Sequence, residues 1–266
     1  MTALLALSSW VAAGHVGLSA ITPAAQALGA RVVGLPTTVL SNHKAWPAVA
    51  GGPTPPETLR AMLDAVAENG WLAGLDAALT GYLPTPDHVA VAAEALARLR
   101  AESPGARIVV DPVLGDDPKG LYLPEETAAA LRDRLAPLAD VITPNRFELA
   151  WLTGAPVDTL DEATAAARAL APARVLVTSP PLPAGATGVL AIGPEGARLH
   201  RTARREAVPH GVGDVFAGLV SAGVETDAAV GMLASLAEES VGRPHLRLAE
   251  TAIWWTGAEP VQGEPL

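Results

Sequence analysis

The segment Pro209-His210-Gly211-Val212-Gly213-Asp214-Val215-Phe216-Ala217-Gly218 places two glycines and an aspartate directly before an apolar, alanine-rich stretch. Glycine adopts backbone conformations closed to other residues and lets a ligand approach the main chain, so Gly211 and Gly213 predict a tight turn. The stretch that follows is predicted to be a helix, whose first N–H groups and dipole favour a bound anion. Asp214 is then a base beside an anion site, as phosphoryl transfer to an alcohol requires. The alternative is that Asp214 only caps the helix.

The composition restricts the functions that this chain can have. Its 266 residues are 50% apolar, enough for a sizeable core, and no stretch resembles a linker, so residues 1–266 are expected to form one domain. The absence of cysteine excludes disulfides, thiolate–zinc sites and cysteine nucleophiles. The net charge is −10 and the only lysines are Lys44 and Lys119, which argues against nucleic-acid binding because that needs a basic face.

The sequence also argues against a membrane protein. No apolar run approaches the length that spans a bilayer. The first twenty residues are apolar but lack the basic residues that begin a signal peptide. We therefore expect a cytoplasmic protein without a membrane partner.

Short apolar runs alternate with helical patterns along the chain. Strands are predicted at Ala3–Ser8, Arg31–Leu35, Ala77–Thr80, Arg107–Val110, Val141–Thr143, Val175–Thr178, Val189–Ile192 and Ala197–His200. Helices are predicted at Ser19–Leu28, from Pro56 to Asn69-Gly70, at Pro86–Ala101, Pro124–Leu135 and Asn145–Trp151, from Thr159, and from Asp214 onward. Ser41–Pro56 is expected to be a long functional loop or lid. The alternation predicts an α/β fold, a three-layer α/β/α sandwich around a mostly parallel sheet.

Polar residues follow several of the predicted strands. They are Ser9, Thr80-Gly81-Tyr82, Asp111, Thr143-Pro144-Asn145, Thr178 and Gly211–Asp214. Ligands of parallel sheets bind beyond the carboxyl ends of the strands, so these side chains are expected to converge on one site.

Several other kinds of site are absent from the sequence. Neither lysine follows a glycine in the pattern of a Walker A loop, and no protein-kinase loop or GxSxG elbow occurs. The six histidines show no spacing typical of zinc ligands. Covalent and zinc chemistry are therefore not expected.

The ordered motifs resemble those of the pyridoxal kinases in the ribokinase-like superfamily. The matching segments are Ser9 with Gly14-His15-Val16-Gly17 and Ser19, then Ser41-Asn42-His43, Thr80-Gly81-Tyr82-Leu83, Asp111-Pro112-Val113-Leu114-Gly115, Thr143-Pro144-Asn145-Arg146-Phe147-Glu148-Leu149 and Gly211-Val212-Gly213-Asp214. The resemblance covers nearly the whole chain. It implies a homodimeric, ATP- and Mg²⁺-dependent kinase that phosphorylates the 5′-hydroxyl of pyridoxal, a B6 vitamer.

The resemblance also implies a role for individual residues. Asp214 would be the general base, with the amides of Gly211, Val212 and Gly213 on the transferring phosphoryl group. Ser9 and His43 would hold and cover the pyridine ring. Glu148 and Tyr122 would lie near the magnesium ion. ATP would contact Asp111, Thr143, Thr178, Arg201 and Arg204.

Simpler interpretations remain open for some of these residues. Asp111 could merely end a strand, Glu148 could be a solvated acid in a first helical turn, and Tyr122 could pack. The chain also departs from the family at Leu18, Lys44 and Ala45, where relatives often carry polar groups toward the vitamer. Two alternatives therefore stand beside the pyridoxal kinase: a kinase of another small alcohol, such as hydroxymethylpyrimidine or a sugar, and a non-catalytic vitamer-binding protein.

Overall fold

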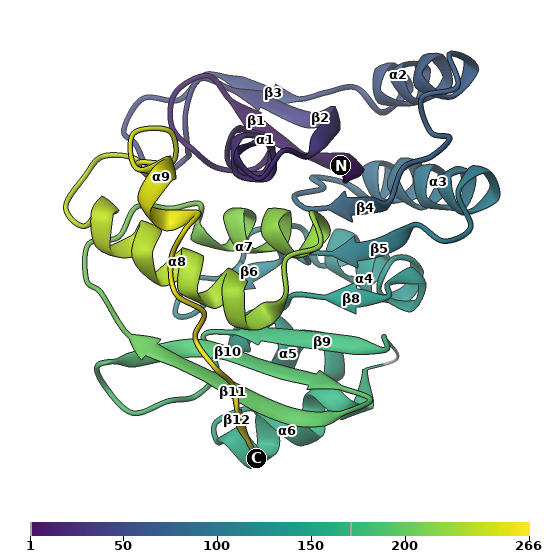
Figure 1. Ribbon diagram of the computed structural model, residues 1–266. Helices are drawn as coiled ribbons and strands as arrows, with labels where there is room; N and C mark the ends of the chain where they lie inside the picture. Colours follow the sequence, from purple (N-terminus) through teal and green to yellow (C-terminus); the bar gives the residue numbers. More distant parts are fainter. Residues whose placement is uncertain (1, 171) are drawn as a thin grey trace.

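A computed structural model describes residues 2–170 and 172–266, in which a mixed β-sheet runs through the middle of the molecule (Figure 1). The strands follow the order β12-β11-β10-β9-β8-β5-β4-β1-β2-β3. Their bounds are β1 Ala3–Val11, β2 Arg31–Leu40, β3 Gly51–Pro53, β4 Ala77–Thr80, β5 Arg107–Val110, β8 Val141–Ile142, β9 Arg174–Thr178, β10 Ala186–Gly193, β11 Gly196–Ala203 and β12 Glu264–Pro265. The run from β2 to β9 is parallel, and antiparallel strands extend both edges.

Helices cover both faces of this sheet (Figure 1). Helices α1 (Leu18–Ala27), α7 (Val212–Ser221), α8 (Thr226–Ser240) and α9 (Ala252–Trp255) lie on one face. The other face carries α2 (Pro56–Glu68), α3 (Pro86–Glu102), α4 (Glu125–Arg134), α5 (Arg146–Thr153) and α6 (Leu160–Ala169), with a short 3₁₀ turn at Ala136–Leu138. The predicted three-layer α/β/α sandwich is confirmed.

The central strand β1 shows why the sequence folds in this way. Its apolar residues run without interruption because both faces of a covered parallel strand are buried. Leu5 and Leu7 pack into the core beneath α2–α6, while Leu4 and Ala6 pack into the core beneath α1 and α7. Each pair contributes to a separate hydrophobic layer, which fixes the register of β1 in the sheet.

Four short strands were not predicted. The expected loop Ser41–Pro56 contains β3, which pairs with the end of β2. A small hairpin, β6 (Gly115–Asp116) and β7 (Gly120–Leu121), follows β5. The segment after α9 is extended rather than helical and ends in β12, which pairs with β11. Glycine and proline dominate these segments, so local propensity for a strand is low and pairing with a distant strand decides the structure.

The extended segment after α9 is fastened to the antiparallel edge of the sheet. It crosses α8 as the yellow ribbon of Figure 1, and the N–H of Val261 donates to the Asp227 carbonyl oxygen at 2.9 Å. The buried His200 on β11 places Nδ1 at 3.1 Å from the Val261 carbonyl oxygen and 3.2 Å from an Asp227 carboxylate oxygen. This segment therefore ties α8 to the β10–β11 hairpin.

The carboxyl ends of β1, β4, β5, β8 and β9 lie along one edge of the sheet because these strands are parallel. The loops that follow them meet the N-terminus of α7 there. Within residues 2–170 and 172–266, no helix has the length and apolarity needed to cross a membrane.

Candidate active site

The turn before α7 has the geometry that its glycines predict. Gly211 is the N-cap residue of α7 with φ of 109°, and a side chain there would overlap the backbone oxygen of His15. The first helical hydrogen bond runs from the N–H of Val215 to the Gly211 carbonyl oxygen at 3.0 Å. The amides of Val212, Gly213 and Asp214 precede it and have no partner within the helix, which makes this end an anion site.

Asp214 lies in the first turn of α7 rather than at the cap position, and its side chain makes no capping hydrogen bond. The alternative of a capping aspartate is therefore wrong. Burial raises the pKa of Asp214 to about 6, and the backbone amide of Gly17 offsets part of that rise. A carboxylate with a pKa near neutrality is suited to accept a proton from an alcohol.

Gly17 brings Ser9 to the same place. It has φ of 55°, and a side chain at this position would overlap the backbone and hydroxyl oxygens of Ser9. The end of β1 and the start of α1 can approach this closely only because Gly17 has no side chain. Ser9 and Asp214 consequently face one cavity.

That cavity, which we call the carboxylate cavity, has a volume of about 530 Å³. Predicted site residues in its lining are Ser9, His43, Asp111, Tyr122, Thr143, Glu148, Thr178, Gly211, Gly213 and Asp214. They come from strand ends, the Ser41–Pro56 loop, the segment after β7, α5 and the start of α7, which are far apart in the sequence. The convergence predicted for the strand ends is confirmed for Ser9, Tyr82, Asp111, Thr143, Asn145, Thr178, Gly211, Gly213 and Asp214, whereas Thr80, Gly81 and Pro144 do not line the cavity.

Two stacked histidines lie beside the glycine turn. The rings of His43 and His210 have centroids 4.2 Å apart and an angle of 28° between their planes. Burial, then His210 and both lysines, lower the pKa of His43 to about 4. Burial and Lys119 also lower the pKa of His210. The pair is therefore uncharged at neutral pH and offers an apolar stacking surface rather than positive charge.

Two further carboxylates are buried in the wall of the cavity. Asp111 follows β5 and accepts a hydrogen bond from the Thr143 hydroxyl at 2.9 Å. Burial, together with the charges of Glu148 and Asp214, raises the pKa of Asp111 well above its ordinary range. Negative charges crowded away from water favour a bound cation. Asp111 is therefore a buried carboxylate at the cavity wall.

The Glu148 carboxylate is fixed by backbone amides of two segments, the start of α5 and the loop after β5. It completes a capping box with Asn145 at the start of α5, and its carboxylate also accepts from the N–H of Leu114 at 2.8 Å. Burial raises the pKa of Glu148 to about 7, although the backbone amides of Asn145, Leu114 and Gly115 lower it. The alternative of a solvated first-turn acid is wrong, because this side chain is buried.

The donor set at this wall fits a magnesium ion only in part. Among the described residues, no cluster of three or more histidine, aspartate or glutamate side chains is arranged to hold a metal. Mg²⁺ in kinases is commonly bound by one or two carboxylates, with water and substrate phosphates completing the shell. Asp111 and Glu148 fit that arrangement. Tyr122 is half-exposed at the same cavity, and burial and Asp116 raise its pKa to about 12, so its phenol stays protonated.

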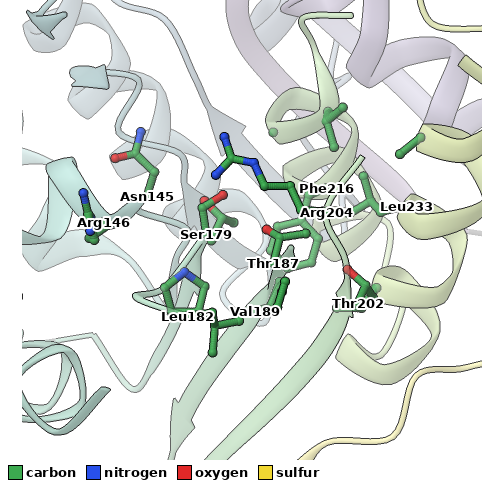
Figure 2. A pocket seen from close by; sticks show the side chains of 18 of the residues that line it. Asn145, Arg146, Ser179, Leu182, Thr187, Val189, Thr202, Arg204, Phe216 and Leu233 are labelled. Carbon is green, nitrogen blue, oxygen red and sulfur yellow. The ribbon is translucent and has the colours of Figure 1, made fainter. Parts of the chain in front are cut away.

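A second cavity of about 720 Å³, which we call the arginine cavity, lies against β10, β11, α7 and α8. Figure 2 shows Arg204 reaching across it toward Ser179, with Phe216 and Leu233 on the α7–α8 side. Asn145, Thr178 and Gly213 line both cavities, so the two spaces meet at the start of α7. Val212 lines the arginine cavity.

The two arginines that were expected to contact the nucleotide lie in different places. Arg204 lines the arginine cavity, as does its neighbour Arg205, which pairs with Glu238. Arg201 does not line either cavity and has its guanidinium 3.9 Å from the carboxylate of Glu264 on β12. Arg201 lies within β11, whereas Arg204 follows the end of that strand and enters the loop that borders the arginine cavity.

Some pocket residues were placed incorrectly or missed. Leu18, expected beside the vitamer, begins α1 and is buried in the core, outside the lining of the carboxylate cavity. Lys44 and Ala45 do line that cavity. The apolar wall of the arginine cavity, including Val208 and Leu233, was not predicted, because apolar residues carry no signal that separates a binding wall from a core. Lys119 was also missed.

Comparisons with known proteins agree with this arrangement. Residues 14–240 match the phosphomethylpyrimidine kinase family. A pyridoxal kinase of Leifsonia xyli subsp. xyli is 39% identical over 225 residues, covering 82% of this chain and 80% of that protein. A pyridoxine/pyridoxal/pyridoxamine kinase of Bordetella avium is 38% identical over 225 residues, with 82% and 76% covered.

A solved structure is similar over the full length. Pyridoxal kinase from Leishmania donovani in complex with ADP and pyridoxamine has a TM-score of 0.89 at 27% identity, and the match covers 100% of both chains. The same enzyme with ADP and pyridoxine has a TM-score of 0.90 at 28% identity, and the match covers 99% of each chain.

The three-layer fold, with a glycine-flanked aspartate where two cavities meet, defines a small-molecule kinase of the ribokinase-like class. The chain belongs to the phosphomethylpyrimidine kinase family.

Proposed function

We propose that this protein phosphorylates the 5′-hydroxyl of pyridoxal, with ATP as phosphoryl donor and Mg²⁺ as the metal, giving pyridoxal 5′-phosphate for vitamin B6 salvage. The observation that carries the proposal is the position of Asp214 and the free amides of α7 at the junction of two cavities. A bisubstrate transfer needs this arrangement, because acceptor and donor must meet at one base and one anion site.

The carboxylate cavity takes the vitamer. It has the size of a small aromatic alcohol, with Tyr82 and His43 as flat surfaces for a pyridine ring and the Ser9 hydroxyl as a polar contact. The 5′-hydroxymethyl group then points to Asp214, which removes its proton as the oxygen attacks the γ-phosphorus. The pKa of about 6 keeps Asp214 ionised and still basic enough to act at neutral pH.

The arginine cavity takes the nucleotide. Phe216 and Leu233 give it an apolar side that suits a base (Figure 2). Thr178 and Arg204 also line this cavity and would contact the phosphates. The amides of Gly211, Val212 and Gly213 receive the oxygens of the transferring group, whose charge grows along the reaction. Arg201, held near Glu264, would need to turn to contact ATP, so Arg204 is the stronger candidate.

Asp111 and Glu148 would hold Mg²⁺ together with the ATP phosphates, and Thr143 would orient Asp111. The metal would neutralise charge on the phosphates. Tyr122 would border this place without ionising. The high pKa values of both carboxylates support a cation here, because bound positive charge would relieve their repulsion.

We further propose that residues 1–266 act as one kinase domain in a cytoplasmic homodimer. Dependence on ATP supports the location. The half-exposed Trp10 and Val39 project from neighbouring β1 and β2 beside α1, and an apolar surface of this kind supports contact with a second copy. Sedimentation equilibrium would measure the oligomeric state, and a monomer at micromolar concentration would contradict the dimer.

A coupled assay that compares pyridoxal, pyridoxine, pyridoxamine and hydroxymethylpyrimidine tests the activity, with mass spectrometry of each product. We expect ATP-dependent gain of one phosphate on pyridoxal that Asp214→Asn removes. Hydroxymethylpyrimidine is the second candidate acceptor because the matching family is described by the phosphorylated form of that ring. Phosphorylation of the pyrimidine alone, or of no acceptor by folded protein, would contradict the proposal.

A further inference from the structure

The carboxylate cavity contains every lysine of an acidic chain. The sequence holds two lysines against a net charge of −10, and both Lys44 and Lys119 line this one space. Lys44 lies over the ring of Tyr82, with Nζ 5.7 Å from the ring centroid. Lys119 is on a different element and has no aromatic partner of this kind among the described residues. The two cations therefore serve different parts of the cavity.

Lys119 lies in the loop of the β6–β7 hairpin, which is held firmly against α5. The Asn145 side-chain amide donates to the Gly115 carbonyl oxygen at 2.8 Å, and Arg146 pairs with Asp117 at 2.7 Å. A side chain at Gly115 would overlap Phe147 and the Gly120 backbone, so hairpin and helix are in close contact. The position of Lys119 at the cavity is consequently set by the same helix that positions Glu148.

The acidic residues of this hairpin are already engaged. Asp117 pairs with Arg146, and Asp116 lies against the Tyr122 hydroxyl. Within residues 2–170 and 172–266, no carboxylate lies within ion-pair distance of Lys119. An exposed ammonium at a cavity lined by Gly211 and Gly213 is available to an incoming anion.

The residues around Lys119 indicate which anion its ammonium group would bind. Lys119 lines the same cavity as the stacked rings of His43 and His210 and the glycine turn, and its charge lowers the pKa of both histidines. Because both rings are uncharged at neutral pH, they add no positive charge there. Lys44 lies over Tyr82, so Lys119 is, among the described residues, the lysine without an aromatic partner in the cavity that Gly211 and Gly213 of the α7 turn also line, where a transferring phosphoryl group would lie. A lysine ammonium binds phosphate as a point charge.

We propose that Lys119 is a catalytic residue that contacts the γ-phosphoryl oxygens of ATP during transfer. The proposal rests on the proposed function for the reaction, but its binding test needs no vitamer. The β6–β7 hairpin would thus supply, from the acceptor side of the junction, the positive charge that other nucleotide-binding folds supply from a Walker lysine.

Lys119→Met tests this proposal, with Lys44→Met as the matched loss of one positive charge from the same cavity. Isothermal titration calorimetry would measure the affinity for the β,γ-imido analogue of ATP and for ADP, both with Mg²⁺. We expect Lys119→Met to weaken the analogue about fivefold to tenfold and ADP less than twofold, because only the analogue has a γ-phosphate. Lys44→Met should leave the ratio of the two affinities unchanged and alter KM for pyridoxal.

Steady-state kinetics give a second measurement. Loss of one preorganised charge at a reacting oxygen commonly costs about 10²–10³-fold in kcat, and an exposed lysine should cost about tenfold to 100-fold. Equal weakening of the analogue and ADP, or a kcat within twofold of the parent, would overturn the proposal. If the parent phosphorylates no vitamer, the comparison of analogue with ADP still decides the role of Lys119, so the two failures are distinguishable.

Discussion

Replacing Asp214 with asparagine should inactivate the enzyme and stabilise the protein at the same time. The amide keeps the shape of the side chain but cannot accept a proton from the 5′-hydroxyl. General base catalysis contributes about 10²–10⁴-fold, so kcat should fall by at least about 100-fold. Affinity for ATP should change little, because the anion site consists of main-chain amides at the start of α7.

The stability change follows from the pKa. Burial raises the pKa of Asp214 from 3.8 to about 6, so the folded protein holds the proton more tightly than the unfolded chain. The favourable contribution is complete below about pH 4 and is lost as the pH rises through 6. At pH 8 the ionised carboxylate therefore costs up to about 3 kcal/mol, and partial contact with solvent reduces this to about 2 kcal/mol. Asparagine does not titrate and avoids the cost.

Thermal unfolding without ligands, followed by circular dichroism at pH 8 and pH 4.5, measures this effect. We expect Asp214→Asn to raise the unfolding temperature by about 5 °C at pH 8 and by only about 2 °C at pH 4.5, where about a third of the cost is present. Asp161→Asn is the matched control, because Asp161 is an exposed acid in the first turn of α6. That variant should lose about 0.3–1 kcal/mol and no activity. If Asp214→Asn behaves like the control, with a lower unfolding temperature and a kcat within tenfold, the assignment of a base is refuted.

Three further substitutions probe the rest of the site. Glu148→Gln should raise the Mg²⁺ concentration for half-maximal activity about tenfold, because a neutral amide binds the cation more weakly than a carboxylate; an unchanged magnesium titration would remove Glu148 from the metal site. Gly211→Ala should cost about 1–3 kcal/mol of unfolding free energy and most of kcat, because its φ is 109° and the methyl group would overlap the His15 backbone. Gly213→Ala, whose methyl group would meet nothing within 4 Å, is its control, and equal unfolding temperatures for the two variants would show that the turn tolerates a side chain. Lys44→Thr with Ala45→Gln should lower KM for pyridoxal by a few-fold to about tenfold for each hydrogen bond gained, with kcat unchanged; an unchanged KM would show that neither position contacts the ring.

The parallel sheet could be predicted because the sequence patterns that indicate its strands and helices lie within single short segments. The continuous apolar run at the start of β1 predicts a strand that is buried on both faces. Asn145, followed three residues later by Glu148, predicts the start of a helix. Once strands and helices alternate, the carboxyl ends of the strands must share an edge, so Asp111 and Thr143 were expected together. They are joined by a hydrogen bond of 2.9 Å.

The features that escaped prediction depend on contacts between distant segments. Hairpin β6–β7 forms because Asn145 and Arg146 hold it against α5, and no property of Gly115–Leu121 alone requires that contact. Leu18 was misplaced because its sequence neighbours belong to the cavity while its own side chain turns into the core beneath α1. Glu148 was expected at the site, but its hydrogen bond to the Leu114 amide could be seen only after folding.

The pairing of β12 with β11 has a consequence for how the chain folds during synthesis. Until residues 264–265 have emerged, β11 is the edge of the sheet, with a row of unpaired backbone groups that another chain could join. The β10–β11 hairpin forms part of the wall of the arginine cavity, so this wall is the last part of the sheet to gain a paired edge. Chains released before residues 264–265 are made should therefore associate through the open edge of β11.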